Sequence, residues 1–213
     1  MKNVTTRPLA IPDVKVIRYE RFADARGYFT ESFRKSDLVK ATAGAVGGWE
    51  IVQANESFSR KGTVRGLHFQ WNPYMGKLVR TVAGRMIDIV LDIRLGSPHF
   101  GRAIAYDLPA DTGSTAAEWI WVPPGFAHGN FFPEDTIIEY LCSGEYSGGN
   151  EAGISPLAAD IDWSLCDPSL REQLRKATSA EGLLMTDKDR NGFTLAGWQG
   201  DERSRNFVHG SGV

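Results

Sequence analysis

The middle of the chain alternates short runs of Val, Ile, Phe, Trp and Thr with Gly, Pro, Asp and Asn. This pattern is typical of many strands joined by turns. The clearest strand covers residues 86–93, where every odd position from 87 to 93 is Ile or Leu, while Asp88 and Asp92 share the other face with Met86 and Val90. Because successive side chains of a strand point to opposite sides, we expect one buried face, the aliphatic one.

Residues 78–82 precede this strand, and the turn Ala83-Gly84-Arg85 is short enough to predict an antiparallel hairpin. Further strands are predicted at residues 103–108, 118–122, 129–132 and 136–142. This spacing favours a sandwich or barrel over alternating strands and helices. We therefore predict an all-β fold, a jelly-roll barrel.

Helical patterning is confined to the flanks, at residues 35–43 and 168–177, each with polar residues in front as possible caps. Residues 200–213 are polar and contain Gly and Ser, which predicts a frayed tail. A chain of 213 residues is enough for one sizeable core. We predict a single domain over residues 1–213, with a barrel core at about 45–160 and a C-terminal flanking segment at 161–213.

The formal net charge of -2 gives no broad positive field, so a nucleic acid is not an expected partner. A small phosphorylated ligand needs only two or three Arg or Lys side chains and stays possible. The sequence has no secretory signal and no apolar stretch long enough to cross a bilayer. We therefore expect a cytoplasmic protein with no membrane partner, in which Cys142 and Cys166 are reduced.

Four histidines occur, and two of them stand in plain settings: His99 follows a proline in a Gly/Ser/Pro turn, and His209 lies in the predicted tail. We expect both to be structural or solvated. His68 is compatible with a core histidine bonded to a neighbour and equally with a catalytic one. His128, in Pro-Gly-Phe-Ala-His-Gly, suits either a pocket or a buried strand entry.

Cationic residues crowd the sequence around His68, which would suit a bound anion, although a solvated basic face is the alternative. They are Arg60, Lys61, Arg65, Lys77 and Arg80. Two histidines on a β-barrel also raise the question of a metal site. Metal-binding cupins present two histidines one residue apart, whereas His68 is followed by Phe, Gln and Trp, so no metal is predicted.

Several segments together resemble, in the same order, blocks of the dTDP-4-dehydrorhamnose 3,5-epimerase family. They are DARGYFTE at 24–31, RGLHFQ at 65–70, GRMIDIVLDIR at 84–94, GSPHFG at 96–101, PGFAHG at 124–129, YLCS at 140–143 and DKD at 187–189. The resemblance covers residues 10 to 190 approximately. It implies a cupin-like double-stranded β-helix with short flanking helices, no cofactor, and a homodimer.

The resemblance also implies a substrate, a nucleoside diphosphate 4-keto-6-deoxyhexose, which we expect to be dTDP-linked. The hydrogens on its C3 and C5 are next to the C4 carbonyl, so removing either one gives an enolate. Inversion then needs a base on one face of the sugar, an acid on the other, and a positive group near the oxygen that gains charge.

By resemblance, His68 is the base, Asp189 the carboxylate that orients it, Tyr140 the acid, and Lys77 the cation beside the C4 oxygen. Taken without the family, Asp189 in Thr-Asp-Lys-Asp also fits a helix cap, and Tyr140 in an apolar run also fits a sheet-packing aromatic. The positions implied to bind the substrate are Arg26, Phe29, Glu31, Gln53, Asn55, Arg60, Arg65, His128, Tyr146 and Glu151.

In the family, the N-terminal strand of one subunit helps to form its neighbour's site, so Arg26 and Phe29 are expected to act across the interface. The sequence departs from the family at residues 147–150, where Ser-Gly-Gly-Asn replaces the common Asn-Pro. Inversion of both carbons is the leading expectation, and inversion of C3 or C5 alone stays open. A non-catalytic sugar-nucleotide-binding cupin, a metal-dependent cupin enzyme, and the choice of nucleobase also stay open.

Overall fold

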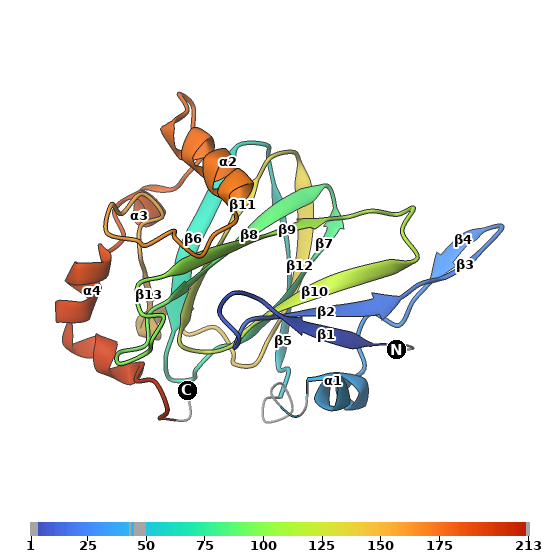
Figure 1. The fold of residues 1–213 in the computed structure, drawn as a ribbon, viewed down its shortest axis with the longest axis horizontal. Coiled ribbons are helices and arrows are strands. Elements are labelled where there is room, and N and C mark those ends of the chain that lie inside the picture. Colours follow the sequence, from blue (N-terminus) through green and yellow to red (C-terminus); the bar gives the residue numbers. More distant parts are fainter. Residues whose placement is uncertain (1–3, 43, 45–49, 212–213) are drawn as a thin grey trace.

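The computed structural model describes residues 4–42, 44 and 50–211. Two antiparallel sheets face each other, which confirms the predicted all-β jelly-roll barrel (Figure 1). The larger sheet has the order β1-β2-β10-β7-β12-β5, with bounds Thr5–Pro8, Lys15–Glu20, Ala116–Val122, Lys77–Ala83, Thr136–Cys142 and Gln53–Ser59. The smaller sheet has the order β13-β6-β11-β8-β9, with bounds Glu151–Gly153, Thr63–Gln70, Phe126–Phe132, Arg85–Asp92 and Ala103–Pro109.

The alternation along β8 is confirmed, but the expectation of one buried face was incomplete, because both faces of this strand are covered. Ile87 and Ile89 belong to a cluster on the outer face of the smaller sheet, together with Leu170 of the C-terminal segment. Met86 and Val90 pack between the two sheets. Strand β8 is therefore a central strand whose two acids are also fully enclosed.

The predicted hairpin between residues 78–82 and 86–93 is wrong, since β7 and β8 lie in different sheets. β7 pairs with β10 and β12, whereas β8 pairs with β9 and β11. Gly84 turns the chain from one sheet to the other with φ +83°, and a Cβ there would lie 2.4 Å from the carbonyl oxygen of Asp135. A short turn between two strands fits a barrel corner as well as a hairpin, and only the pairing distinguishes them.

Both predicted flanking helices are present. Helix α1 (Lys35–Ala41) places Leu38 against the outer face of the larger sheet, and it ends before residue 43, which lies outside the described residues. Helix α2 (Pro168–Ser179) begins at Asp167, whose carboxylate accepts hydrogen bonds from two backbone N–H groups of the first turn. Three shorter helical elements were not predicted: η1 (Gly148–Asn150), α4 (Leu195–Gly200) and η2 (Glu202–Asn206). The short helix α3 (Asp187–Arg190) follows the segment that also fitted a helix cap.

The prediction of a frayed tail is wrong for the described residues up to 211. Phe207 is fully buried, and its ring centroid lies 5.5 Å from that of Phe69 and 6.3 Å from that of Trp198. The backbone N–H of Leu95 donates to the carbonyl of Phe207. One aromatic anchor thus holds a segment whose polar composition alone suggested disorder.

The flanking elements lie on different sides of the two sheets. Helices α2, α3 and α4 lie along one side, while the small hairpin of β3 (Phe22–Asp24) and β4 (Gly27–Phe29) projects away on the opposite side (Figure 1). The larger sheet includes β1 and β2, so it begins before residue 45, the expected start of the barrel core. No helix in the described part of the chain is long and apolar enough to span a membrane.

Candidate functional site

A cavity of about 340 Å³ brings together all four residues with an expected catalytic role and two of the expected binding residues. These six residues are Arg65, His68, Lys77, His128, Tyr140 and Asp189. Two further cavities, of about 320 and 310 Å³, adjoin it, because His68 lines all three. The three cavities form one continuous candidate site around this imidazole.

The two sheets contribute different groups to this site. Strand β6 of the smaller sheet carries His68, and its neighbour β11 carries His128 directly opposite in register. Strands β7 and β12 of the larger sheet carry Lys77 and Tyr140. The imidazole of His68 and the phenol of Tyr140 therefore reach one cavity from opposite sheets, although 72 positions separate them in the chain.

Close backbone approaches fix the position of His68. Gly66 has φ +102°, and a Cβ on it would lie 2.6 Å from the carbonyl oxygen of His128, so only glycine lets β6 and β11 come this near. Gly153 of β13 lies opposite His68 in register, and a Cβ there would be 3.2 Å from the imidazole Cδ2. The histidine is held between two neighbouring strands.

Asp189 of α3 lies behind His68. Its Oδ1 is 2.6 Å from Nε2 of His68, and its side chain is 4% exposed, against 29% for the histidine. Burial alone would raise the pKa of the Asp189 carboxyl, but the hydrogen bond and charge of His68, with further bonds from the backbone, outweigh it and lower that pKa. Because a carboxylate only accepts, Nε2 carries the proton and Nδ1 is the available ring nitrogen.

The helix-cap interpretation of this segment is also confirmed. The hydroxyl oxygen of Thr186 accepts a hydrogen bond from the backbone N–H of Asp189 and caps α3. The backbone of Asp189 therefore takes part in the cap, while its carboxylate binds His68. The string Thr-Asp-Lys-Asp therefore both caps a helix and supplies the carboxylate that bonds to His68.

Lys77 is the cation at the start of β7. Burial lowers the pKa of its ammonium, and the nearby Cys142, Glu151 and Asp88 oppose this shift. Cys142 is its register partner on β12. A partly desolvated ammonium in a cavity interacts more strongly with a developing negative charge than it would in water.

Tyr140 is half-buried and packs against the cluster between the sheets, so the sheet-packing interpretation is correct as far as it goes. Burial raises the pKa of its phenol, as does Cys142, while Arg65 and a hydrogen bond with Asn55 lower it. With a raised pKa, the phenol stays protonated at neutral pH. It therefore has a proton to give.

A second group of polar residues surrounds the cavity of about 310 Å³. Gln53, Asn55, Tyr146 and Glu151 all line it. The Tyr146 hydroxyl donates to Glu151 Oε2 at 3.0 Å, and the ammonium of Lys188 donates to the same oxygen at 2.9 Å. Burial tends to raise the pKa of Glu151, but its bond with Lys188 and its other neighbours lower it.

Four of the expected binding residues do not line these cavities: Arg26, Phe29, Glu31 and Arg60. Arg26 pairs with Asp24 at 2.6 Å on the projecting hairpin, and its side chain is 90% exposed. Phe29 is 67% exposed, and Glu31 forms an ion pair with Arg34. The hairpin of β3 and β4 projects away from the barrel (Figure 1), in agreement with the absence of Arg26 and Phe29 from the cavity walls.

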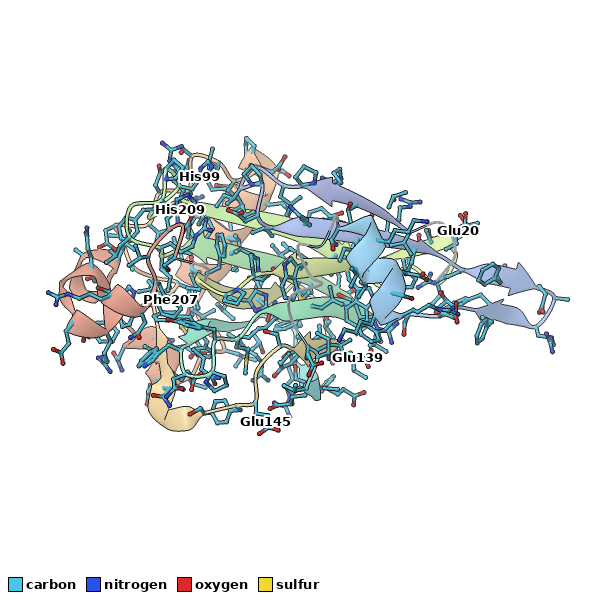
Figure 2. All side chains as sticks on the ribbon, turned by 90° about the horizontal axis from the view of Figure 1, so that it is seen from below. Glu20, His99, Glu139, Glu145, Phe207 and His209 are labelled. Atoms are coloured by element: carbon cyan, nitrogen blue, oxygen red, sulfur yellow. The ribbon has the colours of Figure 1, made fainter. Side chains whose placement is uncertain are left out.

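His99 and His209 line none of the three cavities. Both lie toward the end of the molecule opposite the projecting hairpin (Figure 2). His209 is exposed, and His99 is half-buried with its backbone N–H bonded to the Ser97 hydroxyl. The structure thus places both histidines outside the candidate site.

Three residues of the site escaped the sequence analysis: Asp88, Asn130 and Lys188. Asp88 is completely buried, and its Oδ2 accepts from Nε2 of His128 at 2.7 Å and from Asn130 at 3.0 Å. His128 therefore has both of the settings considered for it, a buried bond and a place on the cavity wall. The sequence feature that could have revealed Asp88 is its position as an acid on the same strand face as the apolar residues Met86 and Val90.

In the described part of the chain, no three His, Cys, Asp or Glu side chains are grouped so as to hold a metal ion. Cys142 and Cys166 are buried and unbonded to each other, in agreement with the expectation of reduced thiols.

Facing sheets with a polar cavity built around a His–Asp pair define a cupin-like jelly roll equipped for proton transfer. The sequence model of the family described as dTDP-4-dehydrorhamnose 3,5-epimerase matches residues 8–197. The chain belongs to the dTDP-4-dehydrorhamnose 3,5-epimerase family, which confirms the resemblance seen in the sequence.

Individual relatives support this assignment. The dTDP-4-dehydrorhamnose 3,5-epimerase of Sinorhizobium fredii is 42% identical over 160 residues, 73% of this chain and 78% of the relative. That of Pseudomonas aeruginosa is 40% identical over 192 residues, 88% of this chain and 94% of the relative.

A solved structure is similar throughout. It is dTDP-6-deoxy-D-glucose-3,5-epimerase from Legionella pneumophila in complex with dTDP-4-keto-L-rhamnose, with TM-score 0.76, 30% identity, and coverage of 91% of this chain and 94% of that chain. A 3'-monoepimerase from Streptomyces bikiniensis in complex with dTDP-quinovose is also similar, with TM-score 0.72, 27% identity, and coverage of 91% and 89%.

Proposed function

We propose that the chain inverts C3 and C5 of a dTDP-4-keto-6-deoxyhexose by removing and returning a proton at each carbon through an enolate. The observation that carries this proposal is the meeting of His68, Tyr140 and Lys77 at one cavity, with the base and the acid on opposite sheets. The complex of the Legionella pneumophila relative with dTDP-4-keto-L-rhamnose supports this substrate class.

In this proposal, Nδ1 of His68 takes the proton from the carbon next to the ketone. The electron pair of the broken C–H bond moves into the C3–C4 or C4–C5 bond, and the C4 oxygen becomes an enolate oxygen. Asp189 holds Nε2–H and stabilises the imidazolium as it forms. Lys77 stabilises the enolate oxygen with its positive charge.

Tyr140 then delivers its phenolic proton to the opposite face of the same carbon, and the ketone re-forms. The phenolate recovers a proton and His68 releases one, so the cycle is balanced and can repeat at the second carbon. Arg65, close enough to lower the pKa of Tyr140, would stabilise the phenolate between these steps.

The binding roles follow the layout of the cavities. We assign the diphosphate to Arg65 and His128, and the nucleotide end to Gln53, Asn55, Tyr146 and Glu151, which line the adjoining cavity. The complex of the Legionella pneumophila relative supports thymine as the nucleobase.

A homodimer would give the hairpin residues a place in this scheme. Arg26 and Phe29 would then serve the site of the neighbouring subunit. The exposure of the aromatic residues on the hairpin supports such a contact, because Tyr28 and Phe29 are 44% and 67% exposed. The two buried thiols agree with the reducing cytoplasm, where we propose that the reaction takes place.

Incubation with dTDP-4-keto-6-deoxyglucose in D2O tests the reaction directly. Deuterium at both C3 and C5 is the expected result. Deuterium at neither carbon would refute an epimerase of this substrate and would leave a non-catalytic binding protein. Activity lost to a chelator and restored by iron, zinc or manganese would refute the metal-free mechanism.

Inversion of C3 alone is the second candidate. The similarity to the Streptomyces bikiniensis 3'-monoepimerase favours it. So does the segment at residues 147–150, which follows Tyr146 at the nucleotide end and differs from the common family pattern. Deuterium at C3 only, in the same assay, would select it.

A further inference from the structure

Asp88 is a buried acid that neither the substrate contacts nor the proton transfers proposed above make use of. It lies in the middle of β8, on the face that points between the sheets, and its side chain is 0% exposed. Burying a carboxylate is costly unless its oxygens are bonded or another charge compensates. A central strand of a stable barrel would otherwise carry an aliphatic residue here.

The bonds of Asp88 lead directly to the cavity wall. Its Oδ2 accepts from His128 at 2.7 Å and from Asn130 at 3.0 Å, and both of these partners line the same cavity as His68 and Lys77. Asp88 itself does not line it. The arrangement repeats that of Asp189 behind His68: a buried acid holds Nε2 of a histidine on the cavity wall.

The bond with Asp88 also decides the form of His128. A carboxylate can only accept, so Nε2 of His128 must carry the proton and Nδ1 becomes the free ring nitrogen. Asn130 donates to the same oxygen and holds the carboxylate in place. Oδ1 of Asp88 has no hydrogen-bond partner among the described residues, which leaves this acid incompletely neutralised by its own bonds.

The remaining negative charge of Asp88 can stabilise the ammonium of Lys77. Among the described residues, no carboxylate lies within ion-pair distance of its ammonium, yet burial lowers its pKa, and Asp88 is one of three groups that oppose this shift. The ionisable groups that oppose this shift or line a cavity together with Lys77 are Asp88 on β8, His128 on β11, Tyr140 and Cys142 on β12, His68 on β6 and Glu151 on β13. Arg65, Lys188 and Asp189 share the larger cavity with it.

We propose that Asp88 is a positioning residue of this site: as a carboxylate, it locks His128 in the Nε2–H tautomer and keeps the ammonium of Lys77 charged from behind the cavity wall. This proposal deepens the proposed function and rests on it for the kinetic part of the test. The tautomer of His128 can be measured without any turnover, so failure of the two ideas can be told apart.

The first experiment is NMR of the full chain labelled with ¹⁵N-histidine. In the wild-type protein, neutral His128 should be the Nε2–H tautomer, and Asp88→Asn should yield a mixture or the other tautomer. An Nδ1–H tautomer in the wild-type protein would overturn the proposal. The tautomer of His128 in the wild-type protein tests the proposal even if the variant fails to fold.

The second experiment is the pH profile of kcat/KM with dTDP-4-keto-6-deoxyglucose. Removing a negative charge near Lys77 lowers the pKa of its ammonium, so the alkaline limb of Asp88→Asn should move to lower pH by about one unit. If the protein turns over no 4-keto sugar, titration of Lys77 labelled with ¹³C at Cε replaces the kinetics. An unmoved limb, or an unmoved Lys77 titration, would contradict the proposal.

Asp92→Asn is the matched control. Asp92 lies on the same face of the same strand and is equally buried, but its carboxylate bonds to Arg94 and Ser97 rather than to residues of the cavity. We expect this variant to lose stability while its alkaline limb stays at the wild-type pH. Equal shifts in the two variants would mean a general disturbance of the strand and would also overturn the proposal.

Discussion

Replacement of Asp189 by asparagine separates the orientation of His68 from the folding of α3. The side chains have nearly the same shape, and the bond from the backbone N–H of Asp189 to Thr186 does not involve the side chain that changes. What is lost is a charge-assisted bond of 2.6 Å to the imidazole. Such a bond contributes about 1.5–3 kcal/mol.

That free energy is needed mainly when the imidazole becomes an imidazolium, so its loss raises the barrier rather than weakening substrate binding. At ~1.4 kcal/mol for each tenfold in rate, we expect kcat to fall by roughly 10–150-fold with little change in KM. Steady-state kinetics measure the fall in kcat, and deuterium uptake at C3 and C5 measures the rate of proton transfer. Asp189→Asn should be slower in both measurements.

Asp187→Asn is the control for this experiment. Asp187 belongs to the same first turn of α3 but is exposed. Its loss should cost a few tenths of a kcal/mol of helix stability at most and leave kcat unchanged. A kcat of Asp189→Asn within threefold of wild type would refute the assignment of Asp189 as the orienting group of the base.

Three further experiments test separate parts of the structure. Tyr140→Phe should still exchange substrate hydrogen for deuterium through His68, but product formation should fall by roughly 10²–10⁴-fold; equal losses of both would contradict an acid role for the phenol. Because folding lowers the pKa of Asp189, its ionised carboxylate stabilises the folded protein at pH values above its ordinary pKa of ~3.9, and this stabilisation is lost as pH falls through the folded-state pKa. Asp189→Asn lacks this carboxylate, so acid denaturation followed by circular dichroism should show a smaller loss of stability below pH ~4 in the variant than in the wild-type protein. Phe207→Ala should destabilise the protein by about 3–5 kcal/mol in chemical denaturation, whereas His209→Ala, at an exposed position, should change it by less than about 0.5 kcal/mol.

Strands β7 to β12 could be predicted because short runs rich in aliphatic and aromatic residues lie between turns, with a clear alternation in β8, whereas β5 and β6 were not predicted. The pairing of strands β7 to β12 could not be predicted. Residues 83–85 form a corner at Gly84, and nothing in the local pattern separates such a corner from a hairpin. The polar tail was misjudged for a related reason, since a single buried side chain, Phe207, outweighs the average composition of its neighbours.

The candidate site could be predicted where a residue type carries chemistry of its own within a recognisable string. His68, Lys77 and Tyr140 fall in this class, and the structure brings them together. Asp88 was hidden because an acid among aliphatic residues of one strand does not reveal its partner on another. Arg26 illustrates the opposite case, because its string is recognisable although its place within a single chain is far from the cavity.

The division of the reacting groups between two layers has a consequence for how such a barrel can change. The gap between the imidazole and the phenol is set by the aliphatic side chains that fill the interior, among them Val79, Val90, Ile120 and Ile138. These residues act as spacers about one side-chain layer thick. Adding or removing a methyl group there would widen or narrow the space for a sugar ring without touching any group that handles a proton.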